Sequence, residues 1–160
     1  MPEVMPDVVV PSRTIGYAEL PGSHGTLLGP TAWTPVTQPQ VAGFADLTHD
    51  HQWIHVDEER AKDGPFGTTI AHGYLTLSLV PFFLGQLLEV TDVSMAVNYG
   101  LEKVRFPAPV PVGASLQASA EIIGAEPRAG STQLTVRVSV RCDGADRPVC
   151  VADVVILFVG

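Results

Sequence analysis

The fold of this chain is most readily inferred from the stretch Ala71–Leu88, AHGYLTLSLVPFFLGQLL. Drawn as a helix, it presents apolar side chains on nearly its whole circumference. A helix that is apolar all round is buried on all sides, so the stretch predicts a long central helix. Pro81 is expected to kink this helix or to mark a break in it. The rest of the chain must therefore supply a large apolar surface to cover it.

The chain after this helix supplies that surface as β-strands. Residues 97–106 and 116–123 are expected strands, and Leu134–Val140 alternates apolar with polar residues, as a half-exposed strand does. The almost continuously apolar run Val149–Val159 predicts a strand that is covered on both faces. An α+β fold follows, in which a curved antiparallel sheet of about five strands wraps a long buried helix.

The size and composition of the chain indicate one domain that associates with a second copy. A length of 160 residues suits a single domain, residues 1–160, with a substantial core. Apolar residues make up 46% and charged residues only 16%, a low charge density for a monomer. One chain would also leave sheet edges open, so we expect a homodimer. Residues 1–30, rich in Pro and Gly, are expected to form an extended N-terminal arm with one short helix.

Charge and cysteine content limit the classes of partner and compartment. A formal net charge of −8 without a basic run argues against nucleic acid and against anionic membrane surfaces. Residues 1–7 have neither the basic start nor the apolar core of a signal peptide, and no apolar run is long enough to span a bilayer. Cys142 and Cys150 flank a turn, so a disulfide is one alternative. We favour two buried free thiols in a cytoplasmic protein.

Signals for two helices bracket a histidine-rich segment. Thr37–Gln40 has the form of a capping box, and apolar residues at helical spacing follow it up to His49. Asp57 is expected to cap a short second helix, Glu58–Lys62, which Gly-Pro then stops. The segment Asp50–Val56 is therefore predicted to be a loop between two helices, where functional residues often lie.

The segment His49–His55, HDHQWIH, contains three of the five histidines of the chain. A loop allows Asp50 and His55 to turn toward one point. There, a carboxylate and an imidazole can hold a water molecule, take its proton and return one. Such a pair can add or remove water, or deprotonate another small nucleophile. The alternative is that Asp50 orients a turn and that His55 is a surface histidine without a chemical role.

A metal site is a further alternative for this segment. His49, Asp50, His51 and His55 are all possible ligands, but no Cys joins them and no H-E-x-x-H pattern is present. Because the segment is expected to be a loop, the spacing of four between His51 and His55 has no special meaning. We expect no metal, and His49 and His51 are left without an assigned role.

The residues that lead into the central helix, Thr68–Gly73, suggest a second part of a site. The first N–H groups of a helix lack intrahelical partners, and the helix dipole adds positive potential there. Gly73 has no side chain to obstruct an approaching group, so its N–H can stabilise a carbonyl oxygen that gains negative charge. The alternative is an ordinary helix start at which Gly73 allows close packing.

Three blocks of sequence together resemble one family. Phe44–Asp57, FADLTHDHQWIHVD, resembles the signature of the MaoC-like hydratases, which reads roughly aromatic-x-x-x-(S/T)-G-D-x-N-P-x-H. These are (R)-specific enoyl-thioester hydratases and 3-hydroxyacyl-thioester dehydratases. Gly64–Gly73, GPFGTTIAHG, is similar to their second conserved region, and Tyr99–Val110 to the strand and turn that follow the helix. The match covers roughly residues 31–158 and is nearest to the NodN-like subgroup, which carries Gln-Trp in place of Asn-Pro.

The resemblance implies a fold and an activity. The fold is a hotdog, a long helix wrapped by an antiparallel sheet, in a homodimer with a shared central sheet and substrate tunnels at the subunit interface. The activity is reversible hydration of trans-2-enoyl thioesters of coenzyme A or acyl carrier protein, as in fatty acid metabolism, without a metal or other cofactor. Asp50 and His55 become the catalytic pair, and Gly73 the backbone donor to the thioester carbonyl. Gln52, in the place of the family's Asn, His72 and Arg105 are candidate substrate-binding residues; Lys103 and Arg105 are the nearest basic residues for carrier phosphates.

The chain departs from the family pattern at two places, and two other functions are alternatives to the hydration that the resemblance implies. His49 replaces the usual Gly before the aspartate, and Gln52-Trp53 replaces Asn-Pro, so the loop loses a fixed φ. A hotdog thioesterase would aim the same water at the carbonyl carbon. A non-catalytic protein would bind the acyl thioester without turnover.

Overall fold

The structure is a computed structural model that describes residues 11–160. The strands are β1 (Arg13–Gly16), β2 (Leu27–Leu28), β3 (Thr34–Pro35), β4 (Leu88–Thr91), β5 (Met95–Arg105), β6 (Ser115–Arg128), β7 (Ser131–Cys142) and β8 (Cys150–Val159). The helices are the 3₁₀ helix η1 (Tyr17–Gly22), α1 (Gln38–Thr48), α2 (Trp53–Val56), α3 (Glu58–Lys62), α4 (Gly73–Ser78) and α5 (Val80–Leu87). None of the helices within the described range is long and apolar enough to cross a membrane.

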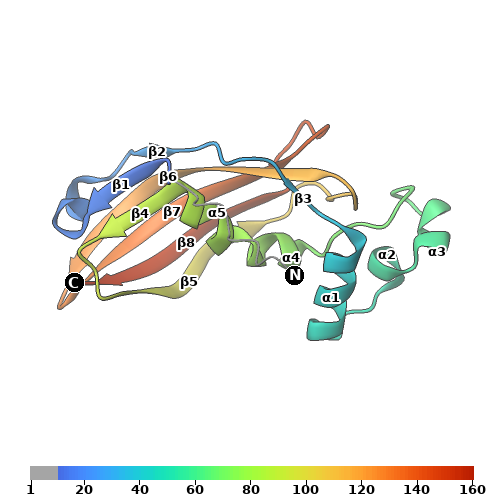
Figure 1. Cartoon of the computed structure of the whole chain (residues 1–160), viewed down its shortest axis with the longest axis horizontal. Coiled ribbons are helices and arrows are strands. Elements are labelled where there is room, and N and C mark those ends of the chain that lie inside the picture. The colour runs from blue at the N-terminus through green and yellow to red at the C-terminus, as the bar shows by residue number, and fades with distance from the viewer. Residues whose placement is uncertain (1–10) are drawn as a thin grey trace, which may run out of the picture.

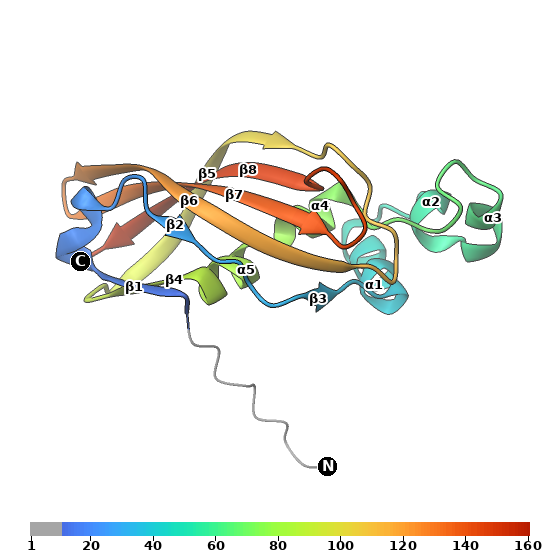
Figure 2. The ribbon, with the colours of Figure 1, turned by 90° about the horizontal axis from the view of Figure 1, so that it is seen from above.

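A six-stranded antiparallel sheet forms the body of the protein. Its strands run in the order β2-β6-β7-β8-β5, and β3 also pairs with β6. Figures 1 and 2 show α4 and α5 lying along one side of this curved sheet. The predicted α+β hotdog arrangement is confirmed. The strand predicted at Val149–Val159 is β8, whose residues Ala152–Ile156 are all buried, because both of its faces are covered.

The central helix is broken where Pro81 was expected to break it. α4 ends at Ser78 and α5 begins at Val80, since the ring of Pro81 fits a first helical turn but not a helix interior. Phe83 and Leu87 are fully buried against the sheet. The expectation of burial on all sides is wrong for the single chain: Tyr74 is 70% and Phe82 50% exposed. The sheet of one chain covers only one side of α4 and α5.

The expected N-terminal arm, residues 1–30, is described only from residue 11. Within that part, β1 pairs in parallel with β4, and β2 pairs with β6. η1 is the one short helix of this part, and Ile15, Leu20 and Leu28 belong to the core. The part of the arm at residues 1–10 lies outside the described residues.

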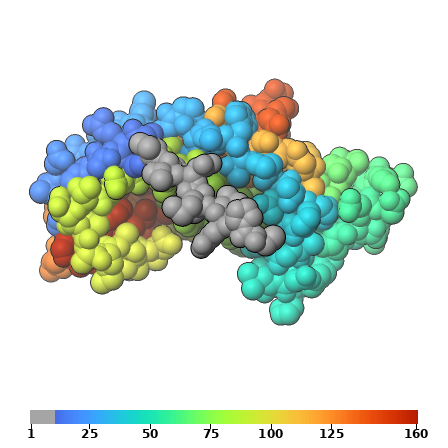
Figure 3. Space-filling model, viewed as in Figure 1, coloured from blue at the N-terminus to red at the C-terminus, as the bar shows by residue number. Residues whose placement is uncertain are grey.

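The segment between β3 and α4 forms α1 and a small lobe, α2–α3, that stands out from one end of the molecule (Figures 1 and 3). The predicted capping box is confirmed: the Thr37 N–H donates to Gln40 Oε1 at 2.9 Å, and Thr37 Oγ1 accepts from the Gln40 N–H. Asp57 caps α3 as predicted, since its carboxylate accepts from the Arg60 N–H. The predicted loop Asp50–Val56 is shorter than expected, because residues 53–56 form the single helical turn α2.

Candidate active site

The turn that follows α1 sets the direction of Asp50. His49 ends α1 in the left-handed conformation, with φ 60° and ψ 24°. Glycine adopts this conformation most readily, which accounts for the Gly that the family pattern has at this place. His49 keeps the same turn with a larger side chain that is exposed. The first departure from the pattern therefore leaves the backbone path to Asp50 intact.

His55 is held in one tautomer on the turn of α2. Its ring is buried, and Nδ1 lies 2.7 Å from the carbonyl oxygen of Ile70. A carbonyl oxygen only accepts hydrogen bonds, so Nδ1 carries the hydrogen and Nε2 keeps a lone pair. Burial lowers the pKa of His55 below its ordinary value, and nearby His72 lowers it further, against the opposing effects of the Ile70 hydrogen bond and Asp50. The lowered pKa favours the neutral ring, and in that form Nε2 offers a lone pair.

Gln38, in the first turn of α1, holds the backbone of His55 from the other side. Its Nε2 donates to the His55 carbonyl at 2.8 Å, and its Oε1 accepts from the Thr69 hydroxyl at 2.6 Å. The sequence does not single out Gln38, because nothing in a capping pattern distinguishes a Gln that reaches across to another segment.

Asp50, His55 and His72 form a compact cluster. One polar side-chain atom of each residue lies within 4.8 Å of the others. The rings of His55 and His72 are stacked, with centroids 3.7 Å apart and planes inclined by 23°. The carboxylate of Asp50 is about half exposed, at 54%, whereas both rings are buried. The sequence-based expectation that Asp50 and His55 turn toward one point is met by this geometry.

Three such residues are also a possible ligand set for a cation, but their hydrogen bonds favour a different use. His55 Nδ1 faces the Ile70 carbonyl, and His72 Nε2 lies 2.9 Å from the Asp50 carbonyl. Each ring thus commits one nitrogen to a backbone oxygen, and the rings face one another rather than directing lone pairs in their own planes to a shared point. His49 and His51, considered as ligands from the sequence, are not part of this cluster.

A cavity of about 320 Å³ opens beside His55 and the start of α4. Gly73 lines it together with Thr76, and Phe106, Val110 and Val149 form part of its apolar wall. Among the described residues, the N–H of Gly73 has no recorded backbone acceptor. A side chain at this position would meet the Phe106 ring, since an added Cβ would lie 2.9 Å from it. Gly73 therefore packs closely against Phe106, as the alternative expected, and it also lines the cavity with an N–H that has no backbone acceptor among the described residues.

Comparison with known proteins places the chain in a family. The model of the MaoC like domain matches residues 20–143. The chain is 49% identical to the 3-hydroxyacyl-thioester dehydratase Z of Mycobacterium tuberculosis over 143 residues, covering 89% of this chain and 95% of the relative. It belongs to the MaoC-like family.

Two further comparisons agree with this assignment. Nodulation protein N of Rhizobium leguminosarum is 38% identical over 142 residues, covering 87% of this chain and 88% of the relative, so the similarity to the NodN-like subgroup is confirmed. The crystal structure of a monoamine oxidase regulatory protein from Archaeoglobus superposes with a TM-score of 0.76 at 28% identity, covering 94% of this chain and 98% of the other.

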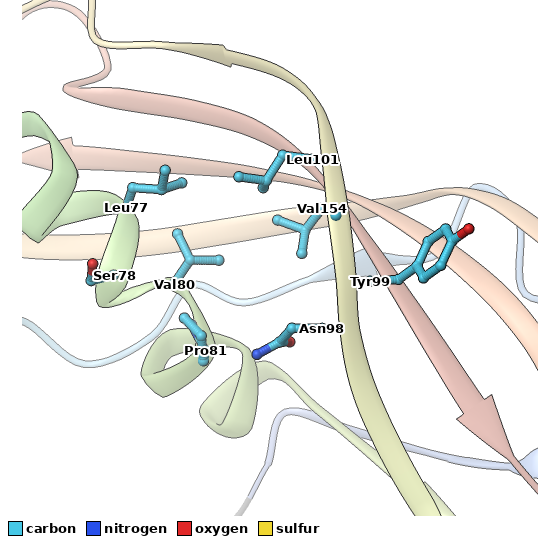
Figure 4. A pocket seen from close by; sticks show the side chains of 9 residues that line it. Leu77, Ser78, Val80, Pro81, Asn98, Tyr99, Leu101 and Val154 are labelled. Atoms are coloured by element: carbon cyan, nitrogen blue, oxygen red, sulfur yellow. The ribbon is translucent and has the colours of Figure 1, made fainter.

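A second cavity of this MaoC-like domain, of about 230 Å³, lies one helical turn farther along, between α4–α5 and the strands β5 and β8. Figure 4 shows Leu77, Val80 and Pro81 facing it from the helical side, and Asn98, Leu101 and Val154 from the sheet. Leu77 follows Thr76 of the first cavity directly, so the two cavities succeed one another along the helix. Phe82 and Phe83 line neither of these two cavities, and Phe83 has the ordinary core role that its sequence context favoured.

The structure does not bring the remaining candidate residues into the cluster. Gln52 precedes α2 with an exposed side chain, and its backbone carbonyl accepts from the His55 N–H. Arg105 is exposed at the end of β5, where its guanidinium donates to the Val104 carbonyl. His51 pairs with Asp46 at 2.8 Å on the surface. The binding roles predicted for Gln52, His72 and Arg105 stay predictions.

Proposed function

We propose that this MaoC-like protein catalyses the reversible hydration of trans-2-enoyl thioesters to (R)-3-hydroxyacyl thioesters. One observation carries the proposal: a single cavity is lined by both His55 and Gly73, with the Asp50 carboxylate within 4.8 Å of the histidine cluster. The residue proposed as the base for water and the residue proposed as the backbone donor to a carbonyl oxygen therefore line the same cavity. The names of the relatives, a 3-hydroxyacyl-thioester dehydratase and an (R)-specific enoyl-CoA hydratase, support the same reaction class.

The reaction follows from the positions of these groups. A water molecule held between Asp50 and His55 attacks C3 of the enoyl group, and an O–H bond of the water breaks as the C3–O bond forms. The proton is delivered to C2 on the same face, where a C–H bond forms. Between these events, negative charge collects on the thioester oxygen, which the Gly73 N–H stabilises. The six residues of α4 add a smaller dipole than the single long helix expected from the sequence.

The chemistry sets what else the protein needs. Hydration adds water and transfers no electrons to an acceptor, so the proposed reaction requires no redox cofactor. The proposed groups are a carboxylate, an imidazole and a backbone N–H, so the proposal also uses no metal. The acyl group is carried by coenzyme A or acyl carrier protein. Arg105 is proposed to contact the carrier phosphates, and Gln52 is proposed to contact the substrate near the loop that carries Asp50. Both side chains are exposed at or near the end of the molecule where the cluster lies.

The cavity in Figure 4 is proposed to take the distal part of the acyl chain, because its walls are mainly apolar and it follows the first cavity along the helix. Leu77→Phe is expected to shift the preference of the enzyme toward shorter enoyl thioesters, as measured by kcat/KM over a series of chain lengths. An unchanged series would contradict this placement of the chain.

The homodimer is proposed to form along β5. This edge strand has eleven residues, all exposed except the half-buried Val104, and they include Met95, Val97, Tyr99 and Leu101. A long apolar edge strand invites pairing with another strand, and the same edge in a second copy is self-complementary. Tyr99→Asp is expected to convert a dimer to a monomer in sedimentation measurements. A wild-type monomer would refute the dimer proposal.

A cytoplasmic location is proposed as well. Cys142 and Cys150 are free and buried, and burial is the main cause that raises the pKa of each thiol to about 11. Such thiols are unreactive and fit a reducing compartment.

The deciding experiment is the hydration of crotonyl-CoA, followed by the loss of enoyl absorbance, for the wild type beside Asp50→Asn. Turnover that disappears in the variant supports both the reaction and the site. Release of free thiol instead of a 3-hydroxyacyl thioester would identify a thioesterase. Tight binding of enoyl thioesters of every chain length without turnover would identify a binding protein and refute the proposal.

A further inference from the structure

The buried imidazole of His72 touches both members of the proposed catalytic pair. It is only 3% exposed and lies at the residue before α4, on a different segment from Asp50 and His55. Its Nε2 lies 2.9 Å from the Asp50 carbonyl oxygen and 4.0 Å from Asp50 Oδ2. Its ring stacks on that of His55 at 3.7 Å. One side chain therefore contacts the backbone that carries the carboxylate and the face of the ring that takes the proton.

The hydrogen bond to Asp50 defines the tautomer of His72. Because the Asp50 carbonyl can only accept, His72 Nε2 carries a hydrogen and donates it. Nδ1 is buried and has no partner among the described residues. A phenylalanine would fill the same space, but it would leave the Asp50 carbonyl without the hydrogen bond that His72 donates. The choice of histidine is therefore explained by its contact with Asp50 and not by packing alone.

His72 is also poorly placed to meet the substrate. It is not among the residues that line the cavity shared by His55 and Gly73. Its neighbours are Asp50, His55 and the ring of Phe44, whose centroid lies 5.0 Å away. What His72 can do is fix the separation between the exposed Asp50 and the buried His55.

We propose that His72 is a positioning residue that acts through Asp50 and His55, rather than a substrate-binding residue. Its Nε2–H anchors the turn that carries the Asp50 carboxylate, and its ring supports the His55 ring from one face. The inference rests on the proposed hydration by this pair. Since a displacement of about 1 Å in an active site can cost on the order of 100-fold in rate, losing this anchor should lower kcat and leave substrate binding almost unchanged.

Two variants separate the two contacts of His72. His72→Phe keeps a ring to stack on His55 but removes the N–H that holds Asp50. His72→Gln keeps an N–H donor at a similar reach but removes the ring. We expect kcat of His72→Phe to fall by about 10- to 100-fold with KM within roughly threefold, and His72→Gln to recover most of that loss. His51→Phe and His51→Gln are the matched controls, because His51 lies in the same turn but pairs on the surface.

The positioning role also predicts non-additive effects. In an Asp50→Asn background, His72→Phe should cost little more, because the group it positions no longer works. A loss confined to KM, an unchanged kcat in His72→Phe, or full additivity with Asp50→Asn would each overturn the inference. If the wild type does not hydrate any enoyl thioester, or Asp50→Asn is as active as the wild type, the proposed function itself fails.

A measurement on the wild-type protein tests the inference without turnover and without a variant that has to fold. The ¹⁵N shifts of the histidine ring nitrogens distinguish the two neutral tautomers. The inference requires the Nε2–H tautomer at His72, donating to Asp50. The Nδ1–H tautomer at His72 would overturn it whatever the kinetics show.

Discussion

Two histidine–aspartate pairs occur within a few residues of one another, and they differ in distance, burial and surroundings. His51 Nε2 lies 2.8 Å from Asp46 Oδ1, yet both side chains are at least half exposed. His55 and Asp50 make a looser pair, but His55 is buried, has a fixed tautomer and lines a cavity. An exposed ion pair contributes little because water screens it and its side chains are mobile. Burial, a defined lone pair and an adjacent cavity, rather than a short distance, are therefore the reasons for proposing His55 and Asp50 as the catalytic pair.

The largest effect is expected from removing the proposed catalytic pair, Asp50 and His55. Asp50→Asn and His55→Gln are each expected to lower kcat for enoyl-thioester hydration by about 10²- to 10⁴-fold. If both groups act on one water, the double variant should be about as slow as the slower single variant. Steady-state kinetics of the three variants checks this. Losses that multiply in the double variant would show that the two groups act independently.

The next largest effect is expected at Gly73, the proposed backbone donor. A Cβ on Gly73 would meet the Phe106 ring at 2.9 Å, so Gly73→Ala should displace the start of α4 or the ring. The N–H then points less accurately at the thioester oxygen, and kcat should fall by about 10- to 100-fold. Gly85→Ala on α5 is the matched control, because nothing lies within 4 Å of its added Cβ. Equal activities of the two variants would remove Gly73 from the mechanism.

The pH dependence of hydration tests whether burial lowers the pKa of His55. Burial first, and then His72, lowers the pKa of His55, while the Ile70 hydrogen bond and Asp50 oppose this. The base must be neutral, so kcat/KM for hydration should fall about tenfold per pH unit below that pKa and stay level above it. The midpoint should lie below the ordinary histidine value of about 6.5. A profile from pH 5 to 8 with a midpoint above that value would contradict the structure.

The smallest effect is expected at the exposed pair, His51 and Asp46. His51→Ala and Asp46→Asn remove the shortest histidine–aspartate contact of the loop, but it is exposed and lies outside the cluster. We expect kcat and KM to change by less than about twofold and stability by less than about 1 kcal/mol. A larger loss of kcat in either variant would mean that the exposed pair, His51 and Asp46, takes part in the reaction.

Much of the fold could be predicted from the sequence, because the patterns that indicate its helix caps and strands lie within single segments. The capping box at Thr37 and the cap at Asp57 each involve residues three apart, and both are confirmed. The alternation of polar and apolar residues predicted β7, and the continuous apolar run predicted β8. The loop predicted at Asp50–Val56 is shorter than expected, since four residues of it form α2. One helical turn is too short for periodicity to reveal it.

The sequence alone identifies the chemical groups of the proposed site: the carboxylate of Asp50, the imidazole of His55, the N–H of Gly73, and the helix and strands that carry them. How those groups are held follows only from the tertiary structure. The contact of His72 with Asp50 spans 22 positions, and that of Gln38 with His55 spans 17. The exposure of Tyr74 likewise depends on which side of α4 the sheet leaves open. Contacts between distant segments depend on how whole layers pack, which no spacing within one segment encodes.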